Sequence, residues 1–508
     1  MNLLSSASIF SFFTIISRIL GYLRDILIAI FLGASIFADA FFVAFRLPNT
    51  FRRLFAEGTF NAAFIPSYDS AKLKSQKEGK KFADDVLNFL LLILLFIVTL
   101  AEIFTPYLVY LIAPGFVDDN IKFNLAVEFT RITFPFLLFV SLCSFFSGIL
   151  NSNNKFAAAA ATPIILNVIL IISILISYFQ NINIAKQLSY GVTLAGIVQL
   201  IFLIFFSLKF YRPNIKLSLK TTNRVKFFFK KLLPSIFSSG ITQINILVGT
   251  IIASFQSGAV SYLYYADRVY QINLAVAGIA VGTVSLPALS KAFQSKNYPK
   301  ISNIQNKSIL LSLIFSVPAS LGLIIASEEI VNGLFGYGSF TVKDIEMTSN
   351  ALMFFGYGVI AFALIKILAN FFFARDNTIT PFYISSFIVF LNVTISIVFF
   401  QKLGFLIVPI ATSISTWIGV LIFLYLLLKN DYLFLQSKLF KNTIKILISS
   451  IIMALVLTQA LEKYSSFLDY TYTYKSVYLL IIVGFVGTVY LLSCYLFGLL
   501  KIKNYKTN

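Results

Sequence analysis

The sequence has 508 residues, of which 58% are hydrophobic and 12% are charged, and its mean hydropathy is +0.89. Soluble proteins carry about twice that share of charged residues, so lipid is the expected surrounding of most side chains. Histidine is absent, and the two cysteines, Cys143 and Cys494, lie far apart in apolar runs. These facts exclude histidine-based catalysis and histidine metal sites, and they argue against a disulfide.

Apolar runs of membrane-spanning length recur along the chain. At ~20 residues per crossing, they predict about fourteen transmembrane helices, at 8–32, 36–63, 86–113, 129–150, 157–179, 188–208, 232–255, 260–288, 308–327, 348–371, 382–400, 404–428, 443–461 and 476–500. We expect the first run to be a retained helix rather than a signal peptide, because Arg18 and Arg24 interrupt it.

The net charge of +20 is concentrated in alternate connectors. If the N-terminus is cytoplasmic, the inner connectors hold most of the lysines. The opposite connectors hold few cations, namely Lys122, Lys186, Lys343, Lys402, Lys463 and Lys475. This asymmetry follows the positive-inside rule, so both termini are expected to be cytoplasmic and no nucleic-acid partner is expected. The basic connector 211–231 fits either a position on the inner leaflet or a purely topological role.

Short motifs recur after the second and the eighth predicted span. Gly58-Thr59-Phe60 and Ile65-Pro66-Ser67 are echoed by Gly282-Thr283-Val284 and Leu286-Pro287-Ala288. Six spans separate the copies, so both halves have the same orientation. Halves of this kind are related by an axis along the membrane normal, an architecture used by alternating-access transporters.

Charged residues inside the predicted spans are the main functional clue. The cations are Arg18, Arg24, Arg46, Arg52, Arg53, Arg131, Arg268 and Lys366, and the acids are Asp25, Asp39, Glu57 and Asp267. Each such charge costs at least ~2.5 kcal/mol on insertion scales. Residues that carry this cost usually line a water-filled cavity or pair with one another, and here the cations outnumber the acids.

Pairing is the first explanation of these charges. Arg53 and Glu57 are four residues apart and can pair along one helix face. Two further pairs share a face at a spacing of seven residues, Arg18 with Asp25 and Asp39 with Arg46. The neighbours Arg24–Asp25 and Asp267–Arg268 are not expected to pair, because adjacent side chains point in different directions. For Arg131 and Lys366, snorkelling or a local pair is the favoured interpretation.

The second explanation is a site for an anion. Arginine presents a planar fork of donors that suits phosphate oxygens, and it keeps its charge in a partly dry cavity. An excess of arginine therefore predicts a phosphate or pyrophosphate group, whereas a cation exporter would need an excess of carboxylates. Tyr262, Tyr264 and Tyr265 fit membrane-interface anchors or sugar-stacking residues, and the anchor is favoured.

The charged motifs also carry a family resemblance. The runs Ser17-Arg18-Ile19-Leu20-Gly21-Tyr22-Leu23-Arg24-Asp25, Arg46-Leu47-Pro48-Asn49 and Arg52-Arg53-Leu54-Phe55-Ala56-Glu57-Gly58 resemble the N-terminal signature of the MurJ (MviN) lipid II flippases. Ala113-Pro114-Gly115-Phe116 and Tyr264-Tyr265-Ala266-Asp267-Arg268 match further motifs in family order. The resemblance covers roughly residues 1–380.

The resemblance implies an all-α polytopic fold of the MOP exporter superfamily. Its parts are an N-lobe at 1–210, the connector 211–231, a C-lobe at 232–428, and two additional helices with a tail at 429–508. The family's essential cavity arginines fall on Arg18, Arg24, Arg52 and Arg268, which implies that these residues bind the substrate. Asp25, Asp39, Arg53 and Glu57 then serve gating or charge pairing, with Asp39 near the outer gate.

The function implied is transfer of lipid II from the inner to the outer leaflet of the bacterial cytoplasmic membrane. The expected partners are lipid II and membrane lipids, the expected state is a monomer, and no cofactor is expected. The alternative is a flippase for another polyprenyl-linked glycan. An enzyme is disfavoured because the sequence offers no convergent acidic or histidine site. A family-type sodium site is doubtful, because the relevant spans offer no carboxylate but only Gln243, Asn245, Asn392, Ser413 and Thr416.

Overall fold

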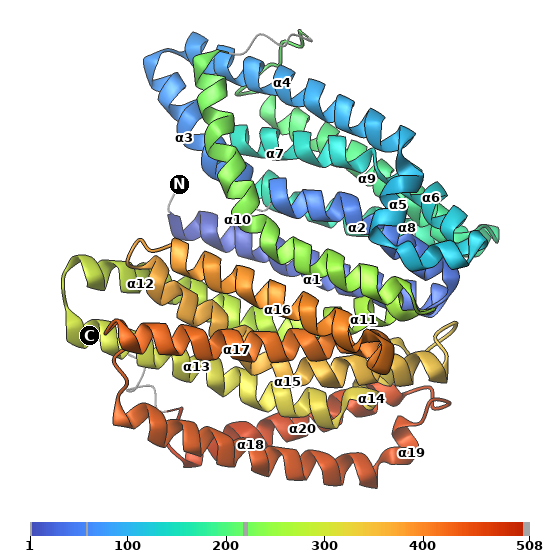
Figure 1. The fold of residues 1–508 in the computed structure, drawn as a ribbon, viewed down its shortest axis with the longest axis vertical. Helices are drawn as coiled ribbons and strands as arrows, with labels where there is room; N and C mark the ends of the chain where they lie inside the picture. Colours follow the sequence, from blue (N-terminus) through green and yellow to red (C-terminus); the bar gives the residue numbers. More distant parts are fainter. Residues whose placement is uncertain (1–2, 57–58, 217–221, 501–508) are drawn as a thin grey trace. The chain divides into compact units, whose positions relative to one another are not determined.

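The computed structural model describes residues 3–56, 59–216 and 222–500, and the side chains of 3–11, 54–56, 59, 223–224 and 231–242 are not part of that description. All regular elements in these ranges are helical (Figure 1). Ten helical segments of the described chain are long and apolar enough to cross a membrane. The expected all-α membrane architecture is confirmed, while the count of about fourteen spans stays a prediction.

The contacts divide the chain into two compact units, Met1–Ser261 and Tyr262–Asn508. The helices of the first unit are α1 (Leu3–Leu32), α2 (Ile36–Ala56), α3 (Thr59–Lys74), α4 (Gln76–Ile103), α5 (Thr105–Ile112), α6 (Asn120–Thr133), α7 (Phe136–Ser152), α8 (Phe156–Gln180), α9 (Ile184–Ser207) and α10 (Asn223–Ser254), with a short 3-10 turn η1 (Pro114–Asp118). The helix α10 thus belongs with the first unit, and the proposed lobe boundaries stay a prediction.

The second unit begins within α11 (Ala259–Leu274). Its other elements are the π-helical turn η2 (Ala275–Ala280), α12 (Val281–Gln294), α13 (Tyr298–Ile325), α14 (Ser327–Phe335), α15 (Val342–Phe373), α16 (Ile379–Leu403), η3 (Gly404–Leu406), α17 (Ile407–Lys429), α18 (Ser437–Lys463), α19 (Ser465–Leu468) and α20 (Lys475–Leu496). Figure 1 shows α18 and α20 together beside α13, which α18 contacts directly.

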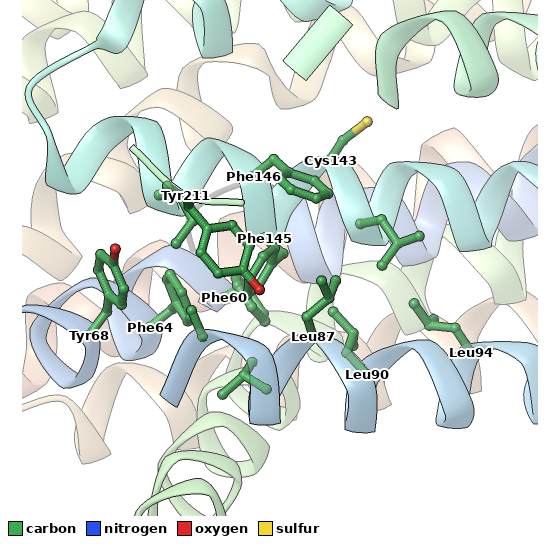
Figure 2. Packing of buried hydrophobic residues seen from close by; sticks show 14 of the residues in the cluster. Phe60, Phe64, Tyr68, Leu87, Leu90, Leu94, Cys143, Phe145, Phe146 and Tyr211 are labelled. Atoms are coloured by element: carbon green, nitrogen blue, oxygen red, sulfur yellow. The ribbon is translucent and has the colours of Figure 1, made fainter. Parts of the chain in front are cut away.

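The helix α3 is longer than the sequence predicted. A connector was expected after residue 63, but α3 continues to Lys74. Phe60, Phe64 and Tyr68 lie four residues apart on one face of the helix, and all three are buried. Figure 2 shows them packed with side chains of α4 and α7, and the ring centroids of Phe64 and Phe145 are 5.2 Å apart. Burial of this aromatic face stabilises the extra helical turns.

A backbone segment is bound by α4 in the first unit. The Asn88 amide nitrogen donates to the carbonyl of Asn214 at 3.0 Å, and its oxygen accepts from the backbone N–H of Lys216 at 2.9 Å. Asp84, one turn earlier, accepts from the Asn214 N–H at 3.1 Å and from the Tyr211 hydroxyl at 2.6 Å. Burial, with Asp84 beside it, raises the pKa of Tyr211, so the phenol stays protonated and donates. The start of the basic connector is therefore fixed to α4.

The same arrangement recurs on α13 in the second unit. The Asn306 amide nitrogen donates to the carbonyl of Phe434 at 2.6 Å, and its oxygen accepts from the N–H of Gln436 at 3.0 Å. Gln305 accepts from the N–H of Phe434 at 3.3 Å. In both units an asparagine thus binds the carbonyl of one residue and the N–H two residues later. The internal repeat inferred from sequence motifs extends to these contacts, which we call the amide clasps.

We expect Asn306→Leu to open the second amide clasp locally. The leucine leaves the Gln436 N–H without its side-chain acceptor, at about 1–3 kcal/mol if the group stays buried, and it leaves the Phe434 carbonyl with the Ser302 hydroxyl, at 3.0 Å, as its side-chain donor. Hydrogen exchange of the 432–436 amides should accelerate by about tenfold or more. Asn430→Leu is the control, since the Asn430 amide donates only within its own helix turn, to Leu426 at 2.7 Å. Equal exchange in both variants would contradict the clasp.

Lys475 connects the start of α20 to neighbouring segments of the second unit. This residue was expected in an outer connector, but it is the first residue of α20 and is only 1% exposed. Its ammonium donates to the carbonyls of Gly336 and Tyr470 at 2.5 and 2.6 Å. It also lies 4.3 Å from the centroid of the Tyr337 ring. Carbonyl oxygens and aromatic faces thus replace water around the buried charge.

Candidate functional site

Arg24 on α1 forms a buried ion pair with its neighbour Asp25. Its Nε and Nη2 donate to Asp25 Oδ1 at 3.0 and 2.6 Å, and the two residues are 6% and 2% exposed. The expectation that these adjacent side chains would not pair is therefore wrong. The arginine side chain is long enough to fold back along the helix, and burial favours the contact because it compensates two desolvated charges.

Asn167 on α8 completes this site. Its Oδ1 accepts from Arg24 Nη1 at 2.9 Å, and its Nδ2 donates to the Ser17 carbonyl at 2.9 Å. Gly21 allows the approach of the two helices, because a Cβ atom there would lie 3.3 Å from Asn167 Nδ2. No pattern in the sequence pointed to Asn167, which is 143 positions away from Arg24.

Asp39 on α2 lies at a second buried cluster of the first unit and is fully inaccessible. Its carboxylate accepts from the Gly258 N–H at 2.9 Å, and from the Ser261 N–H and hydroxyl at 2.9 and 2.6 Å. These donors lie at the start of α11, where the first N–H groups of a helix have no partner within the helix and the dipole favours a negative charge. Asp39 therefore caps α11.

Lys122 on α6 supplies the counter-charge to Asp39. Its ammonium is 2.6 Å from Asp39 Oδ2, and the residue is 4% exposed. The ammonium also lies 4.2 Å from the centroid of the Phe116 ring. Sequence analysis counted Lys122 among the cations of an outer connector, but the structure places it on α6 with its side chain buried. Its partner comes from a helix 83 residues earlier in the chain.

The remaining sequence-predicted charges of the first unit have other environments. Arg18 on α1 is exposed, whereas Arg52 and Arg53 on α2 are partly buried. Arg52 Nε donates to Asn49 Oδ1 at 2.9 Å, one turn earlier on the same helix. Glu57 lies outside the described residues, so its pairing with Arg53 stays a prediction.

In the second unit, Arg268 contacts Tyr264 one turn earlier on α11. Arg268 Nη2 donates to the Tyr264 hydroxyl at 3.0 Å, and the guanidinium carbon is 4.7 Å from the ring centroid. Its neighbour Asp267 accepts a hydrogen bond from Gln271. Tyr262 and Tyr265 are buried, so the interface-anchor interpretation is wrong for these two tyrosines, whose rings pack inside the protein.

Three of the polar residues considered for a sodium site, Asn392, Ser413 and Thr416, form hydrogen bonds within the protein. Asn392 Nδ2 donates to Thr412 Oγ1 at 3.2 Å, and Ser413 Oγ donates to the Phe354 carbonyl at 2.8 Å. No group of three or more cysteine or acidic side chains that could hold a metal ion is found among the described residues.

Comparison with known proteins decides the family. The family model described as lipid II flippase MurJ matches residues 28–479. The chain belongs to the lipid II flippase MurJ family. It is 37% identical over 510 residues to a probable lipid II flippase MurJ of Rickettsia prowazekii, with 99% of each chain covered. It is also 34% identical over 388 residues to the lipid II flippase MurJ of Burkholderia cenocepacia, with 75% of each covered.

Solved structures agree with this membership in the MurJ family. A lipid II flippase MurJ in an inward closed conformation matches with a TM-score of 0.81 at 30% identity, covering 96% of this chain and 98% of the other. An inward-facing MATE multidrug transporter of the MOP superfamily matches with a TM-score of 0.67 at 13% identity, covering 80% and 93%. The second likeness shows the shared fold alone. The protein is therefore a multi-pass membrane protein of the MurJ family, whose matched relatives are flippases and not enzymes.

Proposed function

We propose that this chain is a lipid II flippase, which moves undecaprenyl-pyrophosphate-linked peptidoglycan precursor from the inner to the outer leaflet by alternating access. The observation that carries the proposal is its match to the MurJ family over residues 28–479. The expected location is the bacterial cytoplasmic membrane, with both termini in the cytoplasm, and the expected state is a monomer surrounded by membrane lipids.

Arg18, Arg24, Arg52 and Arg268 are the residues proposed to bind the pyrophosphate. Guanidinium groups suit this substrate because they donate two parallel hydrogen bonds to phosphate oxygens and do not lose their charge. The pyrophosphate of lipid II is negatively charged, so cations are needed beside it while the headgroup crosses the membrane interior.

The Arg24–Asp25 pair makes substrate binding a competition. In the structure the guanidinium of Arg24 is neutralised by Asp25 and bonded to Asn167. A pyrophosphate has to replace part of these contacts to engage Arg24. The exchange keeps Arg24 paired with an anion both before and after binding, whereas the carboxylate of Asp25 has to find another partner once the substrate is bound. A substrate that binds two conformations with equal affinity does not change their populations. Alternating access therefore requires the substrate to bind the two conformations with different affinities.

Asp39 is proposed to act at the outer gate. It accepts four hydrogen bonds, one from Lys122 and three from Gly258 and Ser261 at the start of α11. The boundary between the two compact units falls inside α11, directly after Ser261. Asp39 and its donors all belong to the first unit, so the gating role requires the start of α11 to move away from α2 within that unit, which would break the bonds to Gly258 and Ser261 while Lys122 stays as a counter-charge. This arrangement suits a contact that is made and released during transport.

The second candidate is a flippase for another polyprenyl-linked glycan, such as an O-antigen or capsule unit. The same arginine chemistry would recognise its pyrophosphate. Binding of the purified protein to lipid II, compared with other polyprenyl pyrophosphates, separates the two candidates. Equal affinity for all of them would remove the preference for lipid II.

The site assignment predicts that an Arg24→Ala, Arg268→Ala double variant is inactive. It should fail to rescue growth of bacteria depleted of their own lipid II flippase, and lipid II should accumulate in the inner leaflet. The control variant Lys209→Ala, Arg212→Ala removes two exposed cations near the start of the basic connector and should rescue growth. Normal translocation by the Arg24, Arg268 variant at native expression would refute the arginine assignment.

A further inference from the structure

Each of the two amide clasps presents an exposed aliphatic side chain between the two backbone groups that it binds. In the first unit, Ile215 lies between the bound residues Asn214 and Lys216 and is 61% exposed. In the second unit, Leu435 has the corresponding position and is 54% exposed. The repeat of the backbone contacts thus includes a repeat of the side chain that they leave outside.

Each clasp holds the backbone on both sides of this side chain. One asparagine amide binds the carbonyl of the preceding residue and the N–H of the following residue. In the first unit, Tyr211 adds a bond to Asp84 at 2.6 Å. In the second, Gln305 donates to the carbonyl of Tyr432 at 2.6 Å. The aliphatic side chain cannot turn inward without breaking such bonds, so its exposure is a consequence of the clasp.

Both clasped segments lie just beyond the end of a long apolar helix. The helix α9 ends at Ser207 and α17 ends at Lys429, a few residues before the clasped segment of each unit. The bonds to α4 and α13 keep the segments close to these helix ends. Residues at the end of a membrane-spanning helix lie at the level of the lipid headgroups.

Exposed cations accompany the two aliphatic side chains. Arg212 and Lys216 are exposed near Ile215 in the first unit. In the second unit, Lys441 is exposed in the first turns of α18, next to the exposed ring of Phe440. Apolar side chains among cations suit the boundary between acyl chains and negatively charged headgroups.

A lipid surface fits these observations better than a protein partner does. One exposed hydrophobic residue is common on a protein surface and needs no explanation. Here the same backbone contacts present one in each of two units, although the residues around Ile215 and Leu435 differ in sequence. A protein partner would have to recognise both surfaces, whereas a lipid leaflet surrounds every span that it contains.

We propose that the amide clasps are membrane anchors, which hold Ile215 and Leu435 in the headgroup region of a leaflet that contains anionic phospholipid. The nearby cations contribute attraction to the headgroups. The inference rests on the proposed topology, in which both segments lie on the cytoplasmic side, and it is independent of the substrate that the protein carries.

Spin labels at four positions of the full-length protein in bilayers test the depth of the two side chains. The variants are Ile215→Cys, Leu435→Cys, Ile201→Cys and Lys80→Cys, and the two native cysteines are buried, so their background labelling is low. Ile201 is exposed within α9 and reports on lipid, whereas Lys80 is exposed near the start of α4 and reports on water. The labels at 215 and 435 should be more accessible to oxygen than to a water-soluble nickel complex, as the label at 201 is. If both behave like the label at 80, the anchors are refuted.

The two clasps serve as controls for each other. Asn88→Leu should increase the accessibility of the label at 215 to the nickel complex and leave the label at 435 unchanged. Asn306→Leu should have the opposite selectivity. Equal responses of both labels to either substitution would show that the clasps do not set the depth. Thermal unfolding checks the fold of each variant, and the comparison of the four labels decides the question without the clasp variants.

Lipid composition tests the role of the cations. Replacing phosphatidylglycerol by phosphatidylcholine should make the label at 215 shallower, and Arg212→Gln, Lys216→Gln should remove this difference. Equal depth in both lipids would refute the attraction. Protection of the label in native membranes but not in pure lipid would indicate a protein partner and overturn the proposal.

The sidedness of Lys80→Cys separates this inference from the proposed topology. A membrane-impermeant maleimide should react with the cysteine in inverted membrane vesicles and not in intact spheroplasts. The reverse result would refute the cytoplasmic location, whatever the depth of the labels. Loss of lipid II binding would refute the proposed substrate and leave the measured depths unchanged.

Discussion

Lys122→Met is expected to destabilise the first unit by about 3 kcal/mol, because it leaves the buried carboxylate of Asp39 without its counter-charge. The estimate is at the lower end for a broken buried pair, since Asp39 keeps three hydrogen bonds from Gly258 and Ser261. Methionine matches the length and apolar character of the lysine stem, so the loss reports mainly on the charge. Chemical unfolding of the purified protein in detergent measures the effect.

A double-mutant cycle separates the ion pair from general damage. Asp39→Asn alone should also be strongly destabilising, because it leaves the ammonium of Lys122 buried beside a neutral amide. The double variant Asp39→Asn, Lys122→Met should regain part of the stability lost in either single variant. Additive effects of the two substitutions would show that the 2.6 Å contact between these residues contributes no coupling energy.

The matched control is an exposed ion pair of the same kind. Lys186 and Glu128 lie 2.7 Å apart, and their side chains are 46% and 44% exposed. Lys186→Met should leave the stability nearly unchanged, because water and salt screen an exposed pair. A similar loss in Lys186→Met and Lys122→Met would contradict the argument from burial.

Asp25→Asn is expected to have the second large effect, a loss of about 3–5 kcal/mol, because the buried guanidinium of Arg24 then loses the carboxylate that lies 2.6 Å from its Nη2. Asn167 still accepts from Arg24 at 2.9 Å, but its amide oxygen carries no charge. The arginine is 6% exposed, so water cannot replace the lost carboxylate. Thermal unfolding of the purified variant measures the loss.

Removing both charges should separate stability from transport. Arg24→Met, Asp25→Asn contains neither buried charge and should recover much of the stability that Asp25→Asn loses, since apolar replacements of buried ion pairs are often neutral. It should nevertheless fail to rescue growth after flippase depletion, because the proposed pyrophosphate ligand is gone. A double variant that is both stable and active would show that Arg24 serves only to balance Asp25.

Sequence patterns alone determined the class of this protein and its general plan. The all-α membrane architecture follows from apolar runs long enough to cross a bilayer, because lipid leaves backbone polar groups no partner outside a helix. The repeat was visible in Gly58-Thr59-Phe60 and Gly282-Thr283-Val284. The family resemblance depended on charged motifs such as the one containing Arg18 and Arg24, which stand out because charges are rare within apolar segments.

Only the tertiary structure decided what each of these charges contacts. Asp39 and Lys122 are 83 positions apart, and Arg24 and Asn167 are 143 apart. No local period links such residues, because their contact depends on which helices pack together and on how those helices are rotated about their axes. Sequence analysis counted Lys122 and Lys475 among the connector cations, because the order of apolar runs predicts which residues lie between spans but not whether a side chain is buried. The buried partners and rings around them became visible only in the folded chain.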